Sequence, residues 1–202
     1  MRRIGEPWNP SWSNGTGEGV KFHSLDDLQE WLRSHGISCE SWGKKGTSTK
    51  SVDNLWDEIS SGEAVMTESP ARRRIAAVSV EIKVGGKTLV EARQRLANGA
   101  VRERNSPPAE KQLPRETADV TARRCLHEEL GIRRCRIRLN KKSATAGNRS
   151  DAESPSYPGL TTDYLIWNVS AKVWFLRPKD FETEEATGST HAAVLTHYWE
   201  WH

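Results

Sequence analysis

Residues 116–132, ETADVTARRCLHEELGI, decide the fold of this chain, because their apolar positions have the spacing of a helix. Neither Pro nor Gly interrupts residues 117–130, and Gly131 follows as a stop signal that accepts left-handed backbone. Glu116 stands at the start, where a carboxylate suits the positive end of the helix dipole. The segment therefore predicts an amphipathic helix, whose apolar stripe is Ala118, Ala122, Cys125, Leu126 and Leu130.

The C-terminal end of this helix concentrates acidic groups. Glu128 and Glu129 follow Cys125 by one helical turn, so the three side chains point toward one side. Two adjacent carboxylates at the negative end of the helix dipole repel each other and destabilise this end of the helix by roughly 0.3 kcal/mol. A bound cation would remove this conflict. The alternative is an ordinary solvated helix end, in which Arg124 pairs with Glu128 four residues on.

The segment resembles the Nudix box, G-x5-E-x7-R-E-U-x-E-E-x-G-U, in which U is an aliphatic residue. Two positions depart from it: Glu110 stands in place of the leading Gly, and Cys125 stands in place of the Glu that follows the Arg. An ordered match without a gap is more specific than a short motif. The matching residues are Glu116, Arg124, Leu126, Glu128, Glu129, Gly131 and Ile132.

The resemblance implies an α+β fold, an α/β/α sandwich with a Nudix-like mixed β-sheet and the box helix, preceded by a small helical N-terminal extension. It also implies that carboxylates of this helix bind Mg²⁺ or Mn²⁺. Glu128 and Glu129 are then the candidate catalytic residues and metal ligands, and Glu116 is a third candidate ligand. In the family the Glu replaced by Cys125 is a magnesium ligand and often the catalytic base. A thiol is a soft ligand that is mostly protonated near neutral pH, so the site is expected to be weakened.

Composition narrows the remaining possibilities. The 202 residues suffice for one well-cored domain with an extension, and nine Trp are expected to supply much of the core. No run is long and apolar enough to span a membrane, so we expect no membrane partner. The odd number of Cys, three, without a CxxC pair, argues against a disulfide framework and a structural zinc site. This indicates an intracellular, reducing compartment, the cytoplasm or an organelle interior.

Basic residues are clustered although the net charge is only +3. Such clusters attract phosphate groups of a nucleotide, RNA or anionic lipid, or they are solvated faces with local acidic partners. We expect the substrate or its phosphates to be bound by Arg93, Arg102, Arg104 and Arg124. The other clustered residues are Arg72, Arg73, Arg74, Arg95, Arg133, Arg134, Arg136, Arg138, Lys141 and Lys142.

The chain is expected to divide at residue 66. Residues 1–66 comprise an irregular arm, in which Trp8 and Trp12 suggest docking onto a protein partner, and two short helices at 25–35 and 52–59. Residues 67–202 form the Nudix-like domain. Nudix domains usually pack a second long helix on the opposite face of the sheet, but no such helix follows the box in this sequence. We expect the two N-terminal helices to cover that face instead.

Within residues 67–202 the hydrophobic alternation predicts mainly strands. A basic connector, 67–74, leads to a strand at 75–84, the Gly85-Gly86 hairpin turn, a strand at 88–96, and a short strand at 100–104 after the Asn98-Gly99 turn. After the helix come a strand at 135–139, a long polar loop at 140–159 and the longest strand, 161–175. An acidic loop, 178–190, and a closing strand, 193–201, follow; Glu182, Glu184 or Glu185 could supply a further carboxylate.

Two functions fit these features. The first is a Nudix-fold module that has lost hydrolysis and binds a nucleotide, RNA or a protein partner. The second is a magnesium-dependent pyrophosphohydrolase that cleaves a nucleoside diphosphate derivative slowly, with Glu128 and Glu129 as metal ligands. In the second case another residue must replace the missing base.

Overall fold

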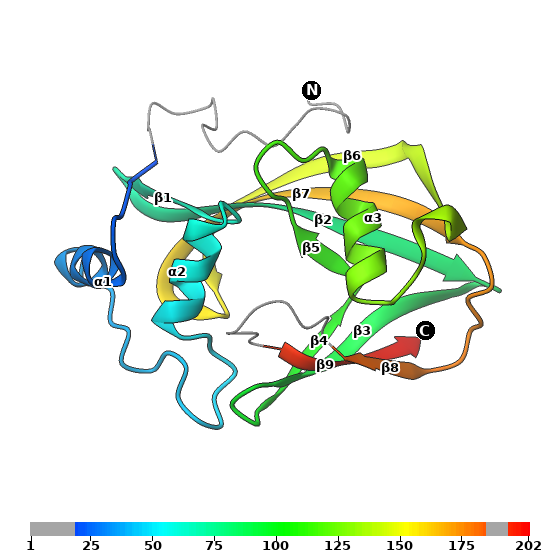
Figure 1. Ribbon diagram of the computed structural model, residues 1–202, viewed down its shortest axis with the longest axis horizontal. Coiled ribbons are helices and arrows are strands. Elements are labelled where there is room, and N and C mark those ends of the chain that lie inside the picture. Colours follow the sequence, from blue (N-terminus) through cyan, green and yellow to red (C-terminus); the bar gives the residue numbers. More distant parts are fainter. Residues whose placement is uncertain (1–18, 185–193) are drawn as a thin grey trace.

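Two groups of strands meet at the Gly85-Gly86 hairpin and diverge from it (Figure 1). The computed structural model describes residues 19–184 and 194–202, of which 141–143 and 149–152 are described by backbone alone. In these residues the first group contains β6 (Ile137–Ser154), β7 (Tyr157–Val173), β2 (Ala71–Val84), β1 (Val65–Glu68) and β5 (Ala109–Lys111). The second contains β4 (Val101–Ser106), β3 (Lys87–Leu96), β9 (Val194–Trp201) and β8 (Phe181–Glu184).

The hairpin is the narrow junction between the groups. β2 and β3 pair only through Lys83 with Thr88 and Val84 with Lys87, and both turn glycines have positive φ, 59° and 83°. Glycine accepts this backbone without the steric penalty that a Cβ would bring. β2 also pairs in parallel with β7 over residues 73–82. The sheet is thus mixed, and with three α-helices in the described residues the fold is α+β.

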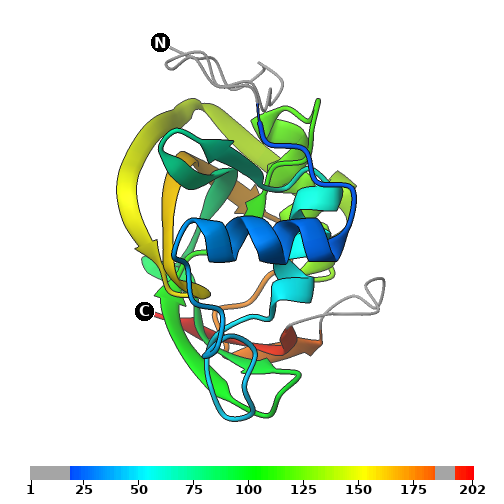
Figure 2. The ribbon, with the colours of Figure 1, turned by 90° about the vertical axis from the view of Figure 1, so that its left-hand side faces the viewer.

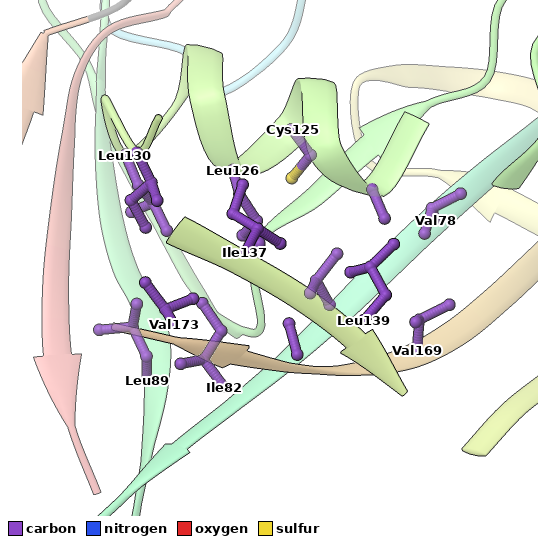
Figure 3. Packing of buried hydrophobic residues seen from close by; sticks show 14 of the residues in the cluster. Val78, Ile82, Leu89, Cys125, Leu126, Leu130, Ile137, Leu139, Val169 and Val173 are labelled. Carbon is purple, nitrogen blue, oxygen red and sulfur yellow. The ribbon is translucent and has the colours of Figure 1, made fainter. Parts of the chain in front are cut away.

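Helix α3 (Ala118–Glu128) packs on the first group near the junction. Its apolar stripe is buried together with residues of β2, β6 and β7 and with Trp199 and Trp201 of β9. Figure 3 shows Leu126 and Cys125 among Val78, Ile137 and Leu139. Complete burial of a side chain such as Leu126 stabilises the fold by about 1.5–3 kcal/mol. The main core is therefore the layer between α3 and the two strand groups.

The N-terminal helices build a second core. α1 (Leu25–Ser34) and α2 (Val52–Ser60) are capped at their N-termini by the side chains of Ser24 and Ser51. Figure 2 shows α1 lying across the end of the molecule. The cluster joins both helices to β1 and to the start of β7, and comprises Leu28, Trp31, Leu32, Trp42, Leu55, Met66, Tyr157 and Leu160.

The predicted helices and most of the predicted strands are confirmed. The box helix ends at Glu128, and Gly131 has the positive φ, 64°, expected after a helix end. β2, β3, β4, β7 and β9 coincide with the predicted strands to within a few residues. The expected arrangement as a three-layered sandwich stays a prediction. So does the domain division at residue 66, which falls inside β1.

Four expectations are wrong, and the largest concerns residues 140–159. These residues were expected to form a polar loop, whereas β6 runs to Ser154 and pairs with β7. The register shifts between Asn140 and Thr145 and again between Arg149 and Ala152. An edge strand that bulges in this way leaves many side chains in water, as at residues 145–148, so it lacks the apolar alternation of an inner strand.

The other three corrections are smaller. Residues 67–74 are not a connector, because β1 and β2 pair there, from Val65 with Arg74 to Glu68 with Ala71. The predicted strand at 135–139 begins only at Ile137, after a 3-10 turn, η1 (Arg134–Arg136). The acidic segment predicted as a loop contains β8, which pairs with β9. β6 and β8 lie at the ends of the strand order, where neighbouring strands decide the structure more than periodicity does.

Candidate functional site

One polar cleft, with a volume of about 1080 Å³, lies between the diverging strand groups. Its lining comes from β2, β5 and β7 on one side and from β3, β4 and β9 on the other. Residues of α2 and the last turn of α3 complete it. A cavity of this size accommodates a ligand as large as a nucleotide, since pockets of about 300–1,000 Å³ bury drug-sized molecules.

Glu116 precedes α3, and three residues donate hydrogen bonds that fix its carboxylate. Its Oε2 accepts from the Leu113 backbone N at 3.0 Å and from Thr121 Oγ1 at 2.9 Å. Arg124 donates Nε to Oε1 and Nη2 to Oε2, both at 3.0 Å. Burial by itself would raise the pKa of Glu116, but these donors outweigh it and lower the pKa. Glu116 therefore acts as a structural anion that ties α3 to the preceding loop.

Arg124 also connects the C-terminal half of α3 to β5. Its Nη2 donates to the Lys111 backbone carbonyl at 2.6 Å, and its Nη1 lies 3.2 Å from Glu128 Oε2 and 3.8 Å from Glu110 Oε1. Although burial lowers the pKa of Arg124, its acidic partners raise it overall. One guanidinium thus holds two of the three predicted metal ligands, Glu116 and Glu128.

Glu110, which occupies the position of the leading Gly in the box, lies in β5 and lines the cleft with Glu128 and Glu129. Burial raises the pKa of Glu110, even though Arg124 and the Lys111 backbone N stabilise its charged form. The structure thus brings Glu110 to the acidic side of the cleft, which the sequence did not indicate. Glu116 is not among the residues that line the cleft.

Cys125 is completely buried and belongs to the main core. Figure 3 shows its sulfur pointing from α3 toward the sheet. Burial raises the pKa of the thiol well above its ordinary value, and the nearby charges of Glu129 and Glu110 raise it further. The thiol is therefore neutral at physiological pH. A buried neutral thiol suits a structural role in the core and not that of a nucleophile.

The donor groups do not fit the Mg²⁺ or Mn²⁺ site that the resemblance implies. Hard divalent cations require several oxygen ligands that converge on one point. In residues 19–184 and 194–202, no three His, Cys, Asp or Glu side chains are grouped so that they could hold a metal ion. The physical reasons are visible at two positions: Arg124 engages Glu116 and Glu128, and position 125 contributes a neutral thiol to the core.

A second group of charges surrounds Glu58 of α2, on the side of the cleft formed by the N-terminal extension. Its carboxylate lies 3.0 Å from Lys50 Nζ and 2.5 Å from Lys111 Nζ, and it also pairs with Arg73. The Tyr157 hydroxyl donates to Glu58 Oε1 at 3.1 Å. Burial by itself would raise the pKa of Glu58, but the three surrounding cations hold it well below the usual range. This buried network connects α2 to β2, β5 and β7.

A third group lies where β3, β4 and β9 meet. Glu91 Oε1 lies 2.5 Å from His197 Nδ1 and accepts a hydrogen bond from Gln94 at 2.6 Å. Arg104 Nε donates to Glu91 Oε2 at 3.1 Å. Burial alone would raise the pKa of Glu91, but hydrogen bonding to His197 and the charge of Arg104 lower it overall. Arg102 lies beside this group and donates to Gln94 Oε1 through Nε and Nη2.

The predicted site residues are thus divided among several places. Arg102, Arg104, Arg124, Glu128 and Glu129 line the cleft. Arg93 is not among its lining residues; it lies over the Tyr198 ring and 3.9 Å from Glu200. The side chains of Glu182 and Glu184 are exposed on β8. Glu185, Trp8 and Trp12 lie outside the described residues.

The clustered basic residues are divided between the cleft, which Arg73, Arg102 and Arg104 line, and other places. Arg72 and Arg74 lie 3.1 Å and 3.7 Å from Asp163 of β7, and Arg73 is buried against Glu58. Arg136 stacks over the Phe175 ring instead. Arg72, Arg73 and Arg74 thus have local acidic partners, as the alternative expects, but Arg73 is buried and does not belong to a solvated face.

Sequence reasoning missed Lys50, Glu58, Glu91, Lys111 and His197. Glu58 occupies a position on the apolar stripe of the second helix, four residues after Asn54 and three after Leu55, where a carboxylate would be buried. A charged residue at a buried helix position requires a partner of opposite charge, so the position of Glu58 in the helix could have identified it as part of a charged network. Glu91 and His197 carry no comparable signal, because their pairing depends on the register of β3 and β9.

Comparison with known proteins is limited to a structural likeness. No protein-family model matches this chain, and no curated protein matches it. Among solved structures, the crystal structure of an Ap4A hydrolase binary complex from C. elegans is 15% identical, with 63% of this chain and 77% of that chain covered and a TM-score of 0.33. A likeness of this size says nothing about the activity of this chain. No helix in the described residues is long and apolar enough to cross a membrane.

Proposed function

We propose that this protein is a Nudix-fold module that binds a nucleoside diphosphate derivative in the cleft and no longer hydrolyses it. The observation that carries this proposal is the engagement of Arg124 with both Glu116 and Glu128, next to the buried thiol of Cys125. Hydrolysis of a phosphoanhydride requires its negative charge to be neutralised, usually by metal ions, before an anionic nucleophile approaches. Two of the carboxylates that would hold such ions, Glu116 and Glu128, are engaged by Arg124, and a third is replaced by Cys125.

The shape and charge of the cleft support binding of a small phosphate-bearing ligand over RNA or a protein partner. It is concave and large enough for a nucleotide, and cationic side chains of Lys50, Arg102 and Arg104 line it. Tyr164 and Ile75, neighbours across the parallel pair β2 and β7, offer an apolar surface for a base or sugar. An extended RNA site would require basic groups that continue along the surface, whereas Arg72 and Arg74 are paired locally.

The magnesium-dependent hydrolase is the second candidate, and one observation favours it. Glu110, Glu128 and Glu129 line the same cleft as the cationic residues, so a ligand could contact both. For catalysis, binding of a ligand and a cation would have to draw Glu128 away from Arg124.

Calorimetry tests the proposal. Diadenosine tetraphosphate, ADP-ribose, UDP-glucose and ADP are titrated into the protein with Mg²⁺ and with EDTA. We expect at least one of them to bind in EDTA, with an affinity that Mg²⁺ changes little. Binding that requires Mg²⁺ would support the hydrolase, and the absence of binding by all four would contradict both candidates.

The variant Cys125→Glu tests why hydrolysis is lost, with Cys125→Ser as its matched control. Position 125 lies one turn before Glu129, so the new carboxylate would be placed beside an existing one. We expect no turnover in Cys125→Ser; magnesium-dependent turnover in Cys125→Glu would identify the missing carboxylate as the cause, and no turnover in Cys125→Glu would identify the engagement of Glu116 and Glu128 by Arg124 as the cause. Circular dichroism checks that both variants fold, because a carboxylate at a buried position costs stability.

A further inference from the structure

We propose that the end of the cleft between Lys50, Arg102 and Ser156 is an anion subsite, and that the N-terminal extension thereby selects ligands that carry a phosphate at this position. This inference rests on the proposed nucleotide-binding function and specifies how the ligand is recognised. Three elements meet there: Lys50 immediately precedes α2, Arg102 belongs to β4, and Ser156 lies in the turn between β6 and β7.

Hydrogen bonds hold these three residues together. The Lys50 backbone N donates to the Ser156 carbonyl at 2.9 Å, and Arg102 Nη1 donates to Ser156 Oγ at 3.2 Å. All three residues line the cleft. Because the turn fixes both the loop before α2 and the guanidinium of β4, their donor groups are positioned before a ligand arrives. A preorganised site loses less entropy on binding.

Positive charge exceeds negative charge in the hydrogen-bonded networks at this end. Five cationic residues, Lys50, Arg73, Arg102, Arg104 and Lys111, are joined to three carboxylates, Glu58, Glu63 and Glu91. Three further carboxylates line the cleft: Asp57 is half-buried, whereas Glu103 and Glu153 are exposed to water, where charge is screened, as is the cation Arg104. The half-buried cations and carboxylates are thus similar in number, and what matters is how they are paired.

Arg102 is the half-buried cation of these networks that has no carboxylate partner in the described residues. In the described part of the chain its guanidinium donates to neutral oxygen atoms, Gln94 Oε1 and Ser156 Oγ, and forms no ion pair with a carboxylate. Burial and the adjacent charge of Arg104 lower the pKa of Arg102. Burial and the charge of Lys111 likewise lower the pKa of Lys50, although Glu58 partly offsets them. Both cations disfavour the unliganded fold, and a bound phosphate would relieve this.

The chemistry of the two side chains suits a phosphate group. A guanidinium binds two phosphate oxygens through parallel N–H donors, and an ammonium adds a compact charge. Lys50 keeps 19% of its side-chain surface exposed and lines the cleft, and it pairs with Glu58. The subsite is separate from the acidic side of the cleft near α3. A ligand with a phosphate here would extend along the cleft toward Glu110 and Glu129.

The test uses Arg102→Gln and Lys50→Gln, with Arg93→Gln as the control, because Arg93 lies outside the cleft lining. ADP and inorganic diphosphate are titrated into each protein by calorimetry. We expect at least a tenfold loss of affinity for both probes in the first two variants and no change in the control. In the absence of ligand, the unfolding temperature of Arg102→Gln should be at least as high as that of the wild type. If Arg102 were purely structural, its loss would lower the unfolding temperature.

Each outcome distinguishes the two proposals. If ADP binds equally to the wild type and to both cleft variants, the subsite is wrong while the nucleotide-binding function stands. If Arg102→Gln is less stable without ligand and binds ADP normally, Arg102 is structural and the subsite is again wrong. If the wild type binds neither ADP, diphosphate nor any larger nucleotide, the proposed function fails and the subsite fails with it.

Discussion

Arg124 binds Glu116 through two parallel hydrogen bonds, each 3.0 Å long, which join the last turns of α3 to the loop that precedes the helix. A bidentate pair of this kind requires a planar guanidinium, and an ammonium cannot reproduce it. The same guanidinium reaches the Lys111 carbonyl and Glu128. The residues that most resemble a catalytic motif thus stabilise the position of α3 against the preceding loop and strand.

The variant Arg124→Lys should destabilise the protein by about 2–3 kcal/mol, because hydrogen bonds to charged groups contribute about 1.5–3 kcal/mol each and one ammonium replaces only part of them. Chemical denaturation measures the change. Arg33→Lys is the control, since the Arg33 side chain is 77% exposed. Equal stability of Arg124→Lys and the wild type would show that the contacts of Arg124 with Glu116, Glu128 and Lys111 contribute little to stability.

The variant Glu58→Gln should lose about 3–5 kcal/mol of stability near neutral pH, because it leaves buried cations without their charge partner. The pKa of Glu58 is lowered in the folded state, so its contribution is fully present above the unfolded pKa and is lost as pH falls through the folded pKa. The difference between Glu58→Gln and the wild type should therefore shrink in strong acid. The exposed pair of Glu30 with Arg33 provides the control, Glu30→Gln, for which about 0.5 kcal/mol or less is expected.

Glu110 should show the opposite behaviour. Its pKa is raised in the folded state by burial, so the charged carboxylate disfavours folding above that pKa. Glu110→Gln should thus be more stable than the wild type at pH 7, and the gain should disappear as pH falls below the unfolded pKa of about 4.5. Urea denaturation at pH 7 and pH 4 measures both values. A loss of stability at pH 7 would instead show that the contact of Glu110 with Arg124 dominates.

The three thiols should react at very different rates. Cys135 is exposed, Cys39 is half-buried with a pKa raised by burial, and Cys125 is buried with a pKa raised further. Alkylation with iodoacetamide followed by mass spectrometry should label Cys135 first, Cys39 more slowly, and Cys125 only after unfolding. Labelling of Cys125 at the rate of Cys135 in the folded protein would contradict a structural thiol.

Local patterns predicted the helices and the inner strands well, for identifiable reasons. α1 and α2 each have a Ser cap and an apolar stripe, and the Gly85-Gly86 turn marks its hairpin directly. The continuation of β6 over residues 140–154 was not predicted, because an edge strand with register shifts need not alternate. The resemblance to the Nudix box drew attention to Glu116, Arg124, Glu128 and Glu129, but not to how Arg124 engages two of these carboxylates.

The cleft itself could not be predicted, because its residues meet only through tertiary contacts. Lys50 and Lys111 reach Glu58 from separate elements, and His197 reaches Glu91 across β3 and β9. Neither spacing along the chain nor composition encodes these distances. Arg102 and Arg104 were singled out as basic residues of one strand, yet their placement in the cleft follows from the divergence of the two strand groups.

The most direct test of the central claim is a turnover assay of the purified protein with diadenosine tetraphosphate, ADP-ribose and UDP-glucose in Mg²⁺ or Mn²⁺, followed by chromatography of the products. Glu129→Gln is assayed in parallel, because Glu129 lines the cleft on α3. We expect no metal-dependent cleavage by either protein, together with ligand binding that survives in EDTA. Cleavage by the wild type that requires the metal and is abolished in Glu129→Gln would contradict it.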